Sequence, residues 1–155
     1  MDLKGIHKFY EALGNALEEM GIEFSYVNGA GEPQIGDTMR ILFPVTEDGH
    51  VALTEVLVTE YTEDLDLLML YTTLVVELNE KAAELPEKLL GWNLICPLGA
   101  YGVFEEEHQL YHKYTMPFDR NGTAEELAND AVTLLELLFG VFSAQYEEYI
   151  AYSAE

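Results

Sequence analysis

Apolar residues recur every three or four positions near both ends of the chain. Residues 3–20 carry such a stripe and Gly21 follows it, which predicts an N-terminal helix with a glycine stop. A longer stripe runs through residues 123–152 and begins with Thr123 and Glu126, the spacing of a capping box. The pattern therefore predicts a helix at each end of the chain, with the longer one at the C-terminal end.

Between these helices the pattern changes to alternation and to runs rich in β-branched and aromatic residues. Tight-turn sequences separate the runs, which is typical of antiparallel hairpins. Pro86 is expected to interrupt a short middle helix over residues 79–93, and Pro117 is expected to end the last strand. The predicted strands span residues 22–27, 38–46, 51–61, 65–78, 100–105 and 110–116.

These elements predict a single α+β domain over residues 1–155. We expect one antiparallel sheet of about five to six strands, flanked by an N-terminal helix, a short middle helix and a long C-terminal helix. A chain of 155 residues is long enough to bury a hydrophobic core of its own. Residues 30–37 are expected to form a polar loop, and their glycines do not follow a phosphate-binding pattern.

The C-terminal helix is apolar around most of its circumference, since only Glu136 is charged within residues 134–142. A helix that is hydrophobic all round must be covered all round. One face can lie on the sheet, whereas the other needs a second helix of this chain, a second subunit or a bound partner, and the pattern leaves these alternatives open. The candidate protein interface consists of Leu134, Leu137, Leu138, Val141, Phe142 and Tyr149.

The formal net charge of −22 limits the partners that the chain can bind. Such a charge repels nucleic-acid phosphates and anionic membranes, so we expect neither as a partner. It favours a basic protein partner, or it simply keeps the protein soluble. Cys96 is the only cysteine, which excludes an intrachain disulfide and CxxC motifs. The chain carries neither a signal-peptide pattern nor an uninterrupted membrane-length span, which predicts a cytoplasmic protein.

Motifs of catalysis or metal binding do not occur in the sequence. HExxH, GxSxG, Walker and EF-hand patterns are absent. His108 and His112 fall at a predicted turn and strand, where their spacing separates them by roughly 13 Å. The acidic clusters at residues 62–66 and 105–107 lack the regular oxygen spacing of a calcium loop. We therefore expect no enzyme, no cofactor and no metal, and a metal-assisted hydrolase is the least favoured alternative.

A small-ligand or regulatory module of unknown ligand is the second alternative, and tyrosines are its candidate binding feature. Tyrosine combines an apolar ring with a polar tip and suits interfaces and half-exposed edges alike. An anionic ligand would have few partners, of which Arg40, Lys113 and Arg120 are the first candidates. The tyrosines of the second predicted hairpin and of the final helical turns are Tyr101, Tyr111, Tyr114, Tyr146, Tyr149 and Tyr152.

The second part of the chain, residues 89–149, resembles the YbjN family, whose small bacterial proteins share the fold of type III secretion chaperones. The resemblance rests on Asn93, on residues 97–104 (PLGAYGVF), on residues 111–117 (YHKYTMP) and on the capped helix that contains residues 134–142. The first part matches only in the order of its elements. The resemblance implies a small, acidic, cytoplasmic homodimer that holds another polypeptide as a chaperone or adaptor, through an acidic surface and the apolar C-terminal helix.

Overall fold

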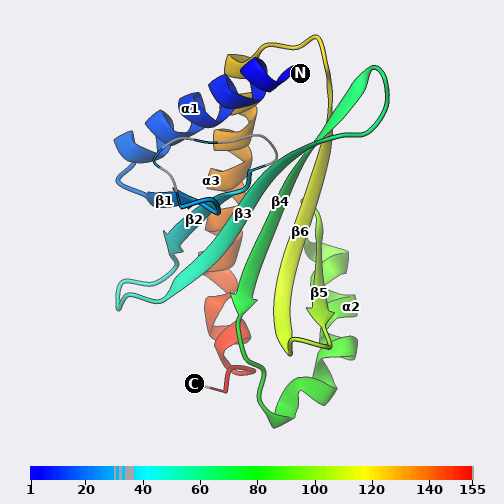
Figure 1. Ribbon diagram of the computed structural model, residues 1–155. Coiled ribbons are helices and arrows are strands. Elements are labelled where there is room, and N and C mark those ends of the chain that lie inside the picture. Colours follow the sequence, from blue (N-terminus) through cyan, green and yellow to red (C-terminus); the bar gives the residue numbers. More distant parts are fainter. Residues whose placement is uncertain (30, 32, 34–36, 155) are drawn as a thin grey trace.

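The computed structural model describes residues 1–29, 31, 33 and 37–154, so most of the predicted polar loop at residues 30–37 lies outside the described residues (Figure 1). The helices are α1 (Leu3–Glu19), the 3-10 helix η1 (Glu80–Glu84), α2 (Leu85–Ile95) and α3 (Ala124–Ile150). The strands are β1 (Glu23–Tyr26), β2 (Met39–Pro44), β3 (Val51–Glu60), β4 (Leu65–Val75), β5 (Ala100–Phe104) and β6 (Gln109–Asp119).

The strands form one six-stranded antiparallel sheet in the order β1-β2-β3-β4-β6-β5. With an N-terminal helix, a short middle helix and a long C-terminal helix, this confirms the predicted α+β class. The hairpin of β2 and β3 and the hairpin of β5 and β6 pair as the turn sequences indicated. The predicted strand at residues 65–78 is present as β4, which ends at Val75 and lies in the middle of the sheet.

Local signals at the helix ends act as predicted. The Thr123 hydroxyl accepts a hydrogen bond from the Glu126 N–H at 3.2 Å, and the Glu126 carboxylate accepts one from the Thr123 N–H at 3.2 Å. This capping box satisfies two backbone donors that the first turn of α3 leaves free. Gly21 follows α1 with a φ of 70°, a conformation that glycine adopts without a Cβ penalty.

Two prolines behave differently from the prediction. Pro86 lies in the first turn of α2, where its missing N–H has no helical acceptor, so it opens this helix instead of interrupting one. The predicted strand end at Pro117 is wrong, because β6 continues to Asp119 and Pro117 pairs with Leu67. Since β5 pairs only with residues 109–113, β6 is an edge strand at this point, where proline is tolerated.

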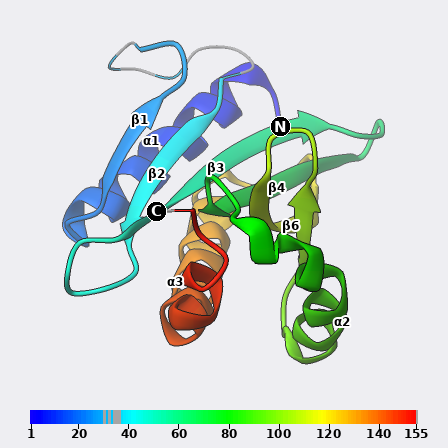
Figure 2. The same ribbon diagram turned by 90° about the horizontal axis from the view of Figure 1, so that it is seen from below.

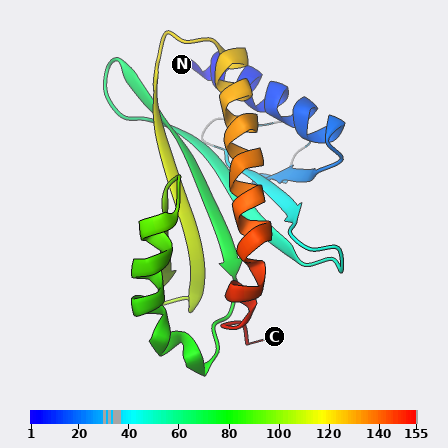
Figure 3. The same ribbon diagram turned by 180° about the vertical axis from the view of Figure 1, so that it is seen from behind.

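The three α-helices cover one face of the sheet and leave the other face open (Figures 2 and 3). Along β3, Ala52, Thr54, Val56 and Val58 are buried beneath the helices, while the residues between them are only half-buried. The same alternation continues along β4 from Asp66 to Leu74. Because successive strand residues point to opposite faces, the helix side of the sheet is the core and the other side is a surface.

The core joins α1 and α3 to the sheet. The Tyr10 hydroxyl donates toward the carbonyls of Asp37 at 3.0 Å and Val56 at 3.3 Å, so the buried tyrosine of α1 satisfies its polar end on the strand region. Phe43 of β2 stacks on Phe139 of α3 with ring centroids 3.7 Å apart. Phe43 thus covers part of α3 from the sheet, and α1 packs against α3 as well, so part of its apolar surface is covered from within the chain.

A buried carboxylate ties three distant segments together. Asp66 at the start of β4 is 1% exposed. It forms an ion pair with the terminal ammonium of Met1, and the Arg120 guanidinium donates to it at 2.8 and 3.1 Å. Burial raises the pKa of Asp66, but the hydrogen bonds and charges of these two cations outweigh it and hold the pKa below its usual range.

Candidate functional site

Helix α2 exposes large apolar side chains to solvent. Leu90, Leu94 and Ile95 are 76%, 85% and 68% exposed, although α2 has only 11 residues. On the opposite side of α2, Trp92 is buried against Tyr101 and Tyr149, and its indole N–H donates to Glu148 at 3.0 Å. Trp92 therefore anchors the helix, and we name the exposed residues Leu90, Leu94 and Ile95 the α2 ridge.

The α2 ridge lies within an uncharged part of an otherwise acidic chain. Residues 89–104 (LLGWNLICPLGAYGVF) contain no Asp, Glu, Lys or Arg. Gly91 lies between the two leucines of the ridge, and a Cβ atom built on it would meet no atom within 4 Å. Gly91 thus leaves an open notch beside the ridge, next to Glu87 and Lys88, and large side chains beside a notch are the surface relief that helix-to-helix packing uses.

The open face of the sheet is a second apolar surface. Cross-strand pairs place Leu42 beside Leu53 and Leu57 beside Met69, all on the side away from the helices. An antiparallel sheet with one solvated face normally alternates apolar and polar residues, yet here the outward positions of β4 are also apolar. We name as the outer patch the residues Leu42, Leu53, Leu57, Leu67, Met69 and Tyr71.

Tyrosines extend the outer patch toward β6. Tyr71 stacks on Tyr111 with ring centroids 5.0 Å apart and an interplanar angle of 21°. A Cβ atom on Gly102 of β5 would lie 2.5 Å from the Tyr111 hydroxyl, so glycine there lets the ring lie flat across the sheet. Burial raises the pKa of Tyr71, and the nearby Tyr111, Glu107 and Glu55 raise it further. Carboxylates therefore stand close to the tyrosine pair.

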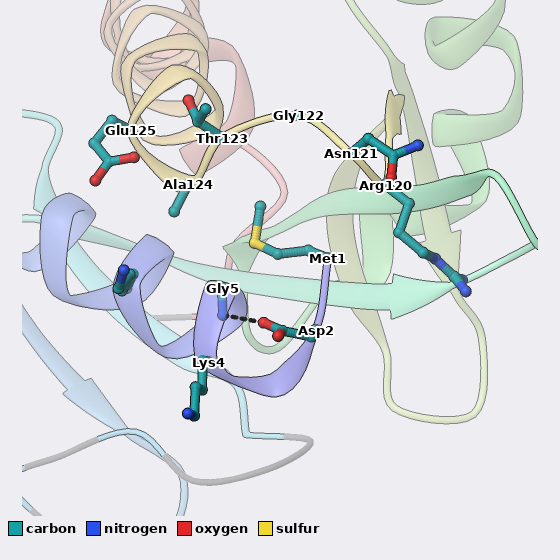
Figure 4. A pocket seen from close by; sticks show the side chains of 11 residues that line it. Met1, Asp2, Lys4, Gly5, Arg120, Asn121, Gly122, Thr123, Ala124 and Glu125 are labelled. Carbon is teal, nitrogen blue, oxygen red and sulfur yellow. Dashed lines mark hydrogen bonds between the residues drawn. The ribbon is translucent and has the colours of Figure 1, made fainter.

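A pocket of about 650 Å³ lies where the first turns of α1 and α3 meet (Figure 4). Lys4, Lys8 and Arg120 line it, which are three of the seven basic residues of the chain. Arg120 is paired with Asp66, and the Asp2 carboxylate accepts the Gly5 N–H at 2.7 Å. In Figure 4 Lys4 and Arg120 point in different directions. Because these groups do not converge, we assign no ligand to this pocket.

A buried polar cluster joins α2, β5, β6 and α3. The hydroxyls of Tyr101 and Tyr149 form a hydrogen bond at 2.7 Å, and the Gln145 carbonyl oxygen lies within hydrogen-bond distance of both, at 2.8 and 3.0 Å. Since each hydroxyl has one hydrogen, one of them donates to Gln145 and the other donates to its neighbour. Burial raises the pKa of Tyr101 to about 12 and also raises that of Tyr149. Asn93 binds the backbone of Tyr101 through both its amide atoms, at 2.6 and 3.1 Å. The cluster fixes α2 to the sheet, and the raised pKa values keep both hydroxyls protonated.

His112 is a further buried member of this region. Its Nε2 lies 2.7 Å from the Leu98 carbonyl, which can only accept, so Nε2 carries the hydrogen. Nδ1 is buried and has no hydrogen-bond partner among the described residues. Gly99, with a φ of 72°, leaves space for the imidazole ring, because a Cβ atom at this position would lie 2.7 Å from the ring. Desolvation lowers the pKa of His112 and keeps the ring neutral.

We expect His112 to make the protein less stable in mild acid. The pKa of His112 in the folded state lies below the ordinary value of 6.5. Just below pH 6.5 its imidazole therefore binds a proton in the unfolded chain but remains neutral in the folded chain. Above pH 6.5 the ring is neutral in both states and does not reduce the free energy of unfolding. As the pH falls below 6.5, His112 lowers that free energy by at most about 1.4 kcal/mol per pH unit. Urea unfolding of wild type and His112→Gln between pH 5 and 7 measures it. If the free energy of unfolding changes equally with pH in both proteins, this role of His112 is contradicted.

The structure divides the candidate interface residues of α3 into two groups. Leu138, Phe142 and Tyr149 are at most 1% exposed, so they belong to the core of this chain and have no free surface in this fold. Leu134 and Val141 are half-buried, and Leu137 is 55% exposed. A partner could therefore contact Leu137 directly and its two neighbours at their edges. The prediction of an interface on α3 remains a prediction and now concerns this smaller group.

Other sequence candidates are dispersed. His112 is buried, whereas His108 lies exposed in the β5–β6 turn with a φ of 53°. Arg40 pairs with Glu55 at 3.1 Å on the open sheet face, and Arg120 is bound to Asp66. Cys96 is a half-buried free thiol whose Sγ lies 3.0 Å from the Leu98 carbonyl. Within the described part of the chain, no group of three or more His, Cys, Asp or Glu residues is placed to hold a metal ion.

Sequence reasoning missed the α2 ridge and the outer patch. The uncharged run at residues 89–104 was a usable signal for the ridge. For the outer patch the signal was the run Leu67-Leu68-Met69-Leu70, since consecutive apolar residues in a strand face both sides of a sheet. From either run alone, however, one cannot tell which side chains other parts of the chain bury and which remain exposed.

Helix α3 is long and apolar enough to cross a membrane, by length and composition alone. This differs from the expectation that no segment is long enough. In the fold, however, nine of its side chains are buried, among them Leu135 and Phe139. A core helix passes the same test of length and composition, so this single helix is a weak indication of a membrane protein.

A scan against models of known protein families finds no match, and neither does a search of curated protein sequences. The resemblance of residues 89–149 to the YbjN family therefore remains a prediction based on the residues alone.

Proposed function

We propose that this protein is a non-enzymatic protein-binding domain, chaperone- or adaptor-like, that acts in the cytoplasm as a homodimer. The observation that carries the proposal is the α2 ridge, whose three side chains are 68% to 85% exposed. Contiguous exposed apolar surface marks interaction sites in soluble proteins. The resemblance to the YbjN family favours the same function, because it implies a dimer that holds another polypeptide.

A second copy of the chain is the occupant that best fits the α2 ridge. With a net charge of −22, two copies repel each other wherever their carboxylates face. Residues 89–104 carry no charged side chain, so copies that meet there bring fewer like charges together than on the rest of the surface. The nearest charges on α2 have both signs, because Glu87 and Lys88 lie beside Gly91. In a two-fold contact the leucines of one ridge can enter the notch at Gly91 of the other.

Neutral polar substitutions in the α2 ridge should convert a dimer into a folded monomer. We expect wild type to sediment as a dimer at micromolar concentration and the Leu90→Gln/Leu94→Gln variant as a monomer. At concentrations low enough for wild type to be monomeric, the unfolding midpoints of the two proteins should agree, because both side chains are exposed in the single chain. At higher concentrations the wild-type midpoint should lie above that of the variant, because association stabilises the folded state. Sedimentation velocity over a range of concentrations measures the association, and circular dichroism confirms the fold.

The matched control is Val27→Gln/Tyr61→Gln, which removes two exposed apolar side chains elsewhere, 50% and 68% exposed. This variant should remain dimeric. A wild-type protein that stays monomeric at every concentration would contradict the proposed dimer. A ridge variant that still sediments as a dimer would place the interface on another surface.

A further inference from the structure

The central strands of the sheet are apolar on both faces, but only one face is covered. Along β4, Leu68 and Leu70 are fully buried beneath the helices, while Leu67 and Met69 point to the open side. Strands that read as nearly continuous apolar runs are those buried on both sides. Among the described elements, no helix or strand lies over the outer side of β3 and β4 (Figure 1). Their outward side chains are half-buried by one another, and only the end of the patch at Leu42 and Leu53 shares a pocket with Tyr146 and Ile150 of α3. The rest of the outer patch is therefore accessible to a partner.

The charge distribution around the outer patch indicates what covers it. Among the outward positions of β3 and β4 only Glu55 is charged, and Arg40 already pairs with it. On β6, Lys113 is cross-strand neighbour to Tyr71 and brings one positive charge to that side. The turns at the strand ends are acidic instead. Their exposed carboxylates are those of Glu47, Asp48, Glu60, Glu63, Asp64, Glu105, Glu106 and Glu107.

We propose that the outer patch binds an amphipathic helix of a partner protein, with an apolar stripe along its middle and basic residues near its ends. Backbone groups within a sheet are already paired, so a ligand on the face of a sheet is held by side chains, and a helix is the usual cover. The apolar stripe lies on Leu57 and Met69. The basic ends lie near the carboxylates of the turns, which also attract such a partner over long range.

The tyrosine pair strengthens one end of this site. Tyr71 and Tyr111 present stacked rings on the open side, and Glu55 and Glu107 stand close enough to raise the pKa of Tyr71. A Lys or Arg side chain of the partner can lie over a tyrosine ring with its charge near these carboxylates. This inference rests on the proposed protein-binding function, but it uses a different surface from the α2 ridge and does not require the dimer.

Fluorescently labelled helical peptides of about 14 residues, long enough to span the patch, test the site. The probe has a leucine stripe flanked by lysines, and its matched control is a scrambled peptide of identical composition. We expect the helical probe to bind wild type at least tenfold more tightly than the scrambled peptide in fluorescence anisotropy. Equal binding of the two peptides would show non-specific charge attraction and would overturn the proposal.

Substitution by glutamate distinguishes binding through apolar contacts from binding through charge attraction at this site. Met69→Glu adds a negative charge, which would strengthen a purely electrostatic association with a basic peptide, yet we expect it to weaken binding at least tenfold. Leu57→Glu should do the same. The control Gln109→Glu adds the same charge on the same face of the sheet, outside the patch, and should bind at least as tightly as wild type.

Unchanged or tighter binding by folded Met69→Glu and Leu57→Glu would overturn the proposal. So would loss of peptide binding in Leu90→Gln/Leu94→Gln with retention in Met69→Glu, because it would place the peptide on the α2 ridge. Conversion of a wild-type dimer to monomer by Met69→Glu would identify a second copy as the occupant and would likewise overturn the helix proposal. A monomeric wild type that binds the helical probe at the outer patch would support this inference while contradicting the proposed dimer.

Discussion

Replacement of Phe142 by alanine should destabilise the fold by about 3–5 kcal/mol, the usual cost of removing a buried aromatic ring. Phe142 is 0% exposed, and its ring packs against the imidazole of His112 with centroids 5.2 Å apart. The surrounding core cannot collapse fully into the space that the ring leaves, so the cost includes a cavity as well as lost burial. Urea unfolding at pH 7 measures the change in the free energy of unfolding.

Leu137 is the matched control, because it lies on the same helix and is 55% exposed. Leu137→Ala should change the free energy of unfolding by no more than about 0.5 kcal/mol. If Leu137→Ala proves as costly as Phe142→Ala, another subunit buries Leu137 in solution and α3 carries part of an interface. If Phe142→Ala is nearly neutral, the assignment of this residue to the core of the chain fails.

Substitution of Asp66 by asparagine should cost about 3–5 kcal/mol, because it leaves the buried terminal ammonium of Met1 and the partly buried guanidinium of Arg120 without their counterion. The Asp66 carboxylate is 1% exposed and receives both the terminal ammonium of Met1 and the guanidinium of Arg120. These partners are 65 and 54 residues away in sequence, so the substitution loosens the first turn of α1 and the chain before α3 from β4. Thermal and urea unfolding of the variant measure the loss.

Glu55→Gln is the control for a removed ion pair. Glu55 pairs with Arg40 at 3.1 Å, but both side chains are partly exposed, so we expect a cost of about 0–1 kcal/mol. Because the pKa of Asp66 is lowered in the folded protein, the dependence of the unfolding free energy on pH gives a second test. Its stabilisation is present above the ordinary pKa of 3.8 and decreases as the pH falls toward the folded-state value, a dependence that Asp66→Asn should lack. Equal losses in the two variants would contradict a special role for the buried carboxylate.

Much of the fold could be predicted because its signals are local. The capping box of Thr123 and Glu126, the glycine after α1 and the turns of the two hairpins each involve residues a few positions apart. Pro117 failed as a strand terminator for a non-local reason. A proline ends a strand only where a neighbouring strand needs its N–H. The residues around Pro117 do not reveal that β5 stops short of this position.

The candidate site could be predicted far less well. The periodicity of α3 separates Leu138 from Leu137 by only one position, yet the first is 1% exposed and the second 55%. Whether an apolar residue is core or surface depends on which other elements pack beside it. On α3 these elements are the sheet, α1 and the Trp92 side of α2, so half of the predicted interface became core.

The sequence by itself determined the class of each element, the caps and turns between them and the acidity of the surface, because these follow from neighbouring residues and composition. Only the tertiary structure decided which apolar side chains remain uncovered. It buried Phe142 and Tyr149, exposed Leu90 and Leu94, and brought Asp66 to its two cations. Burial and ion pairing depend on contacts between segments far apart in the chain, which no local pattern specifies.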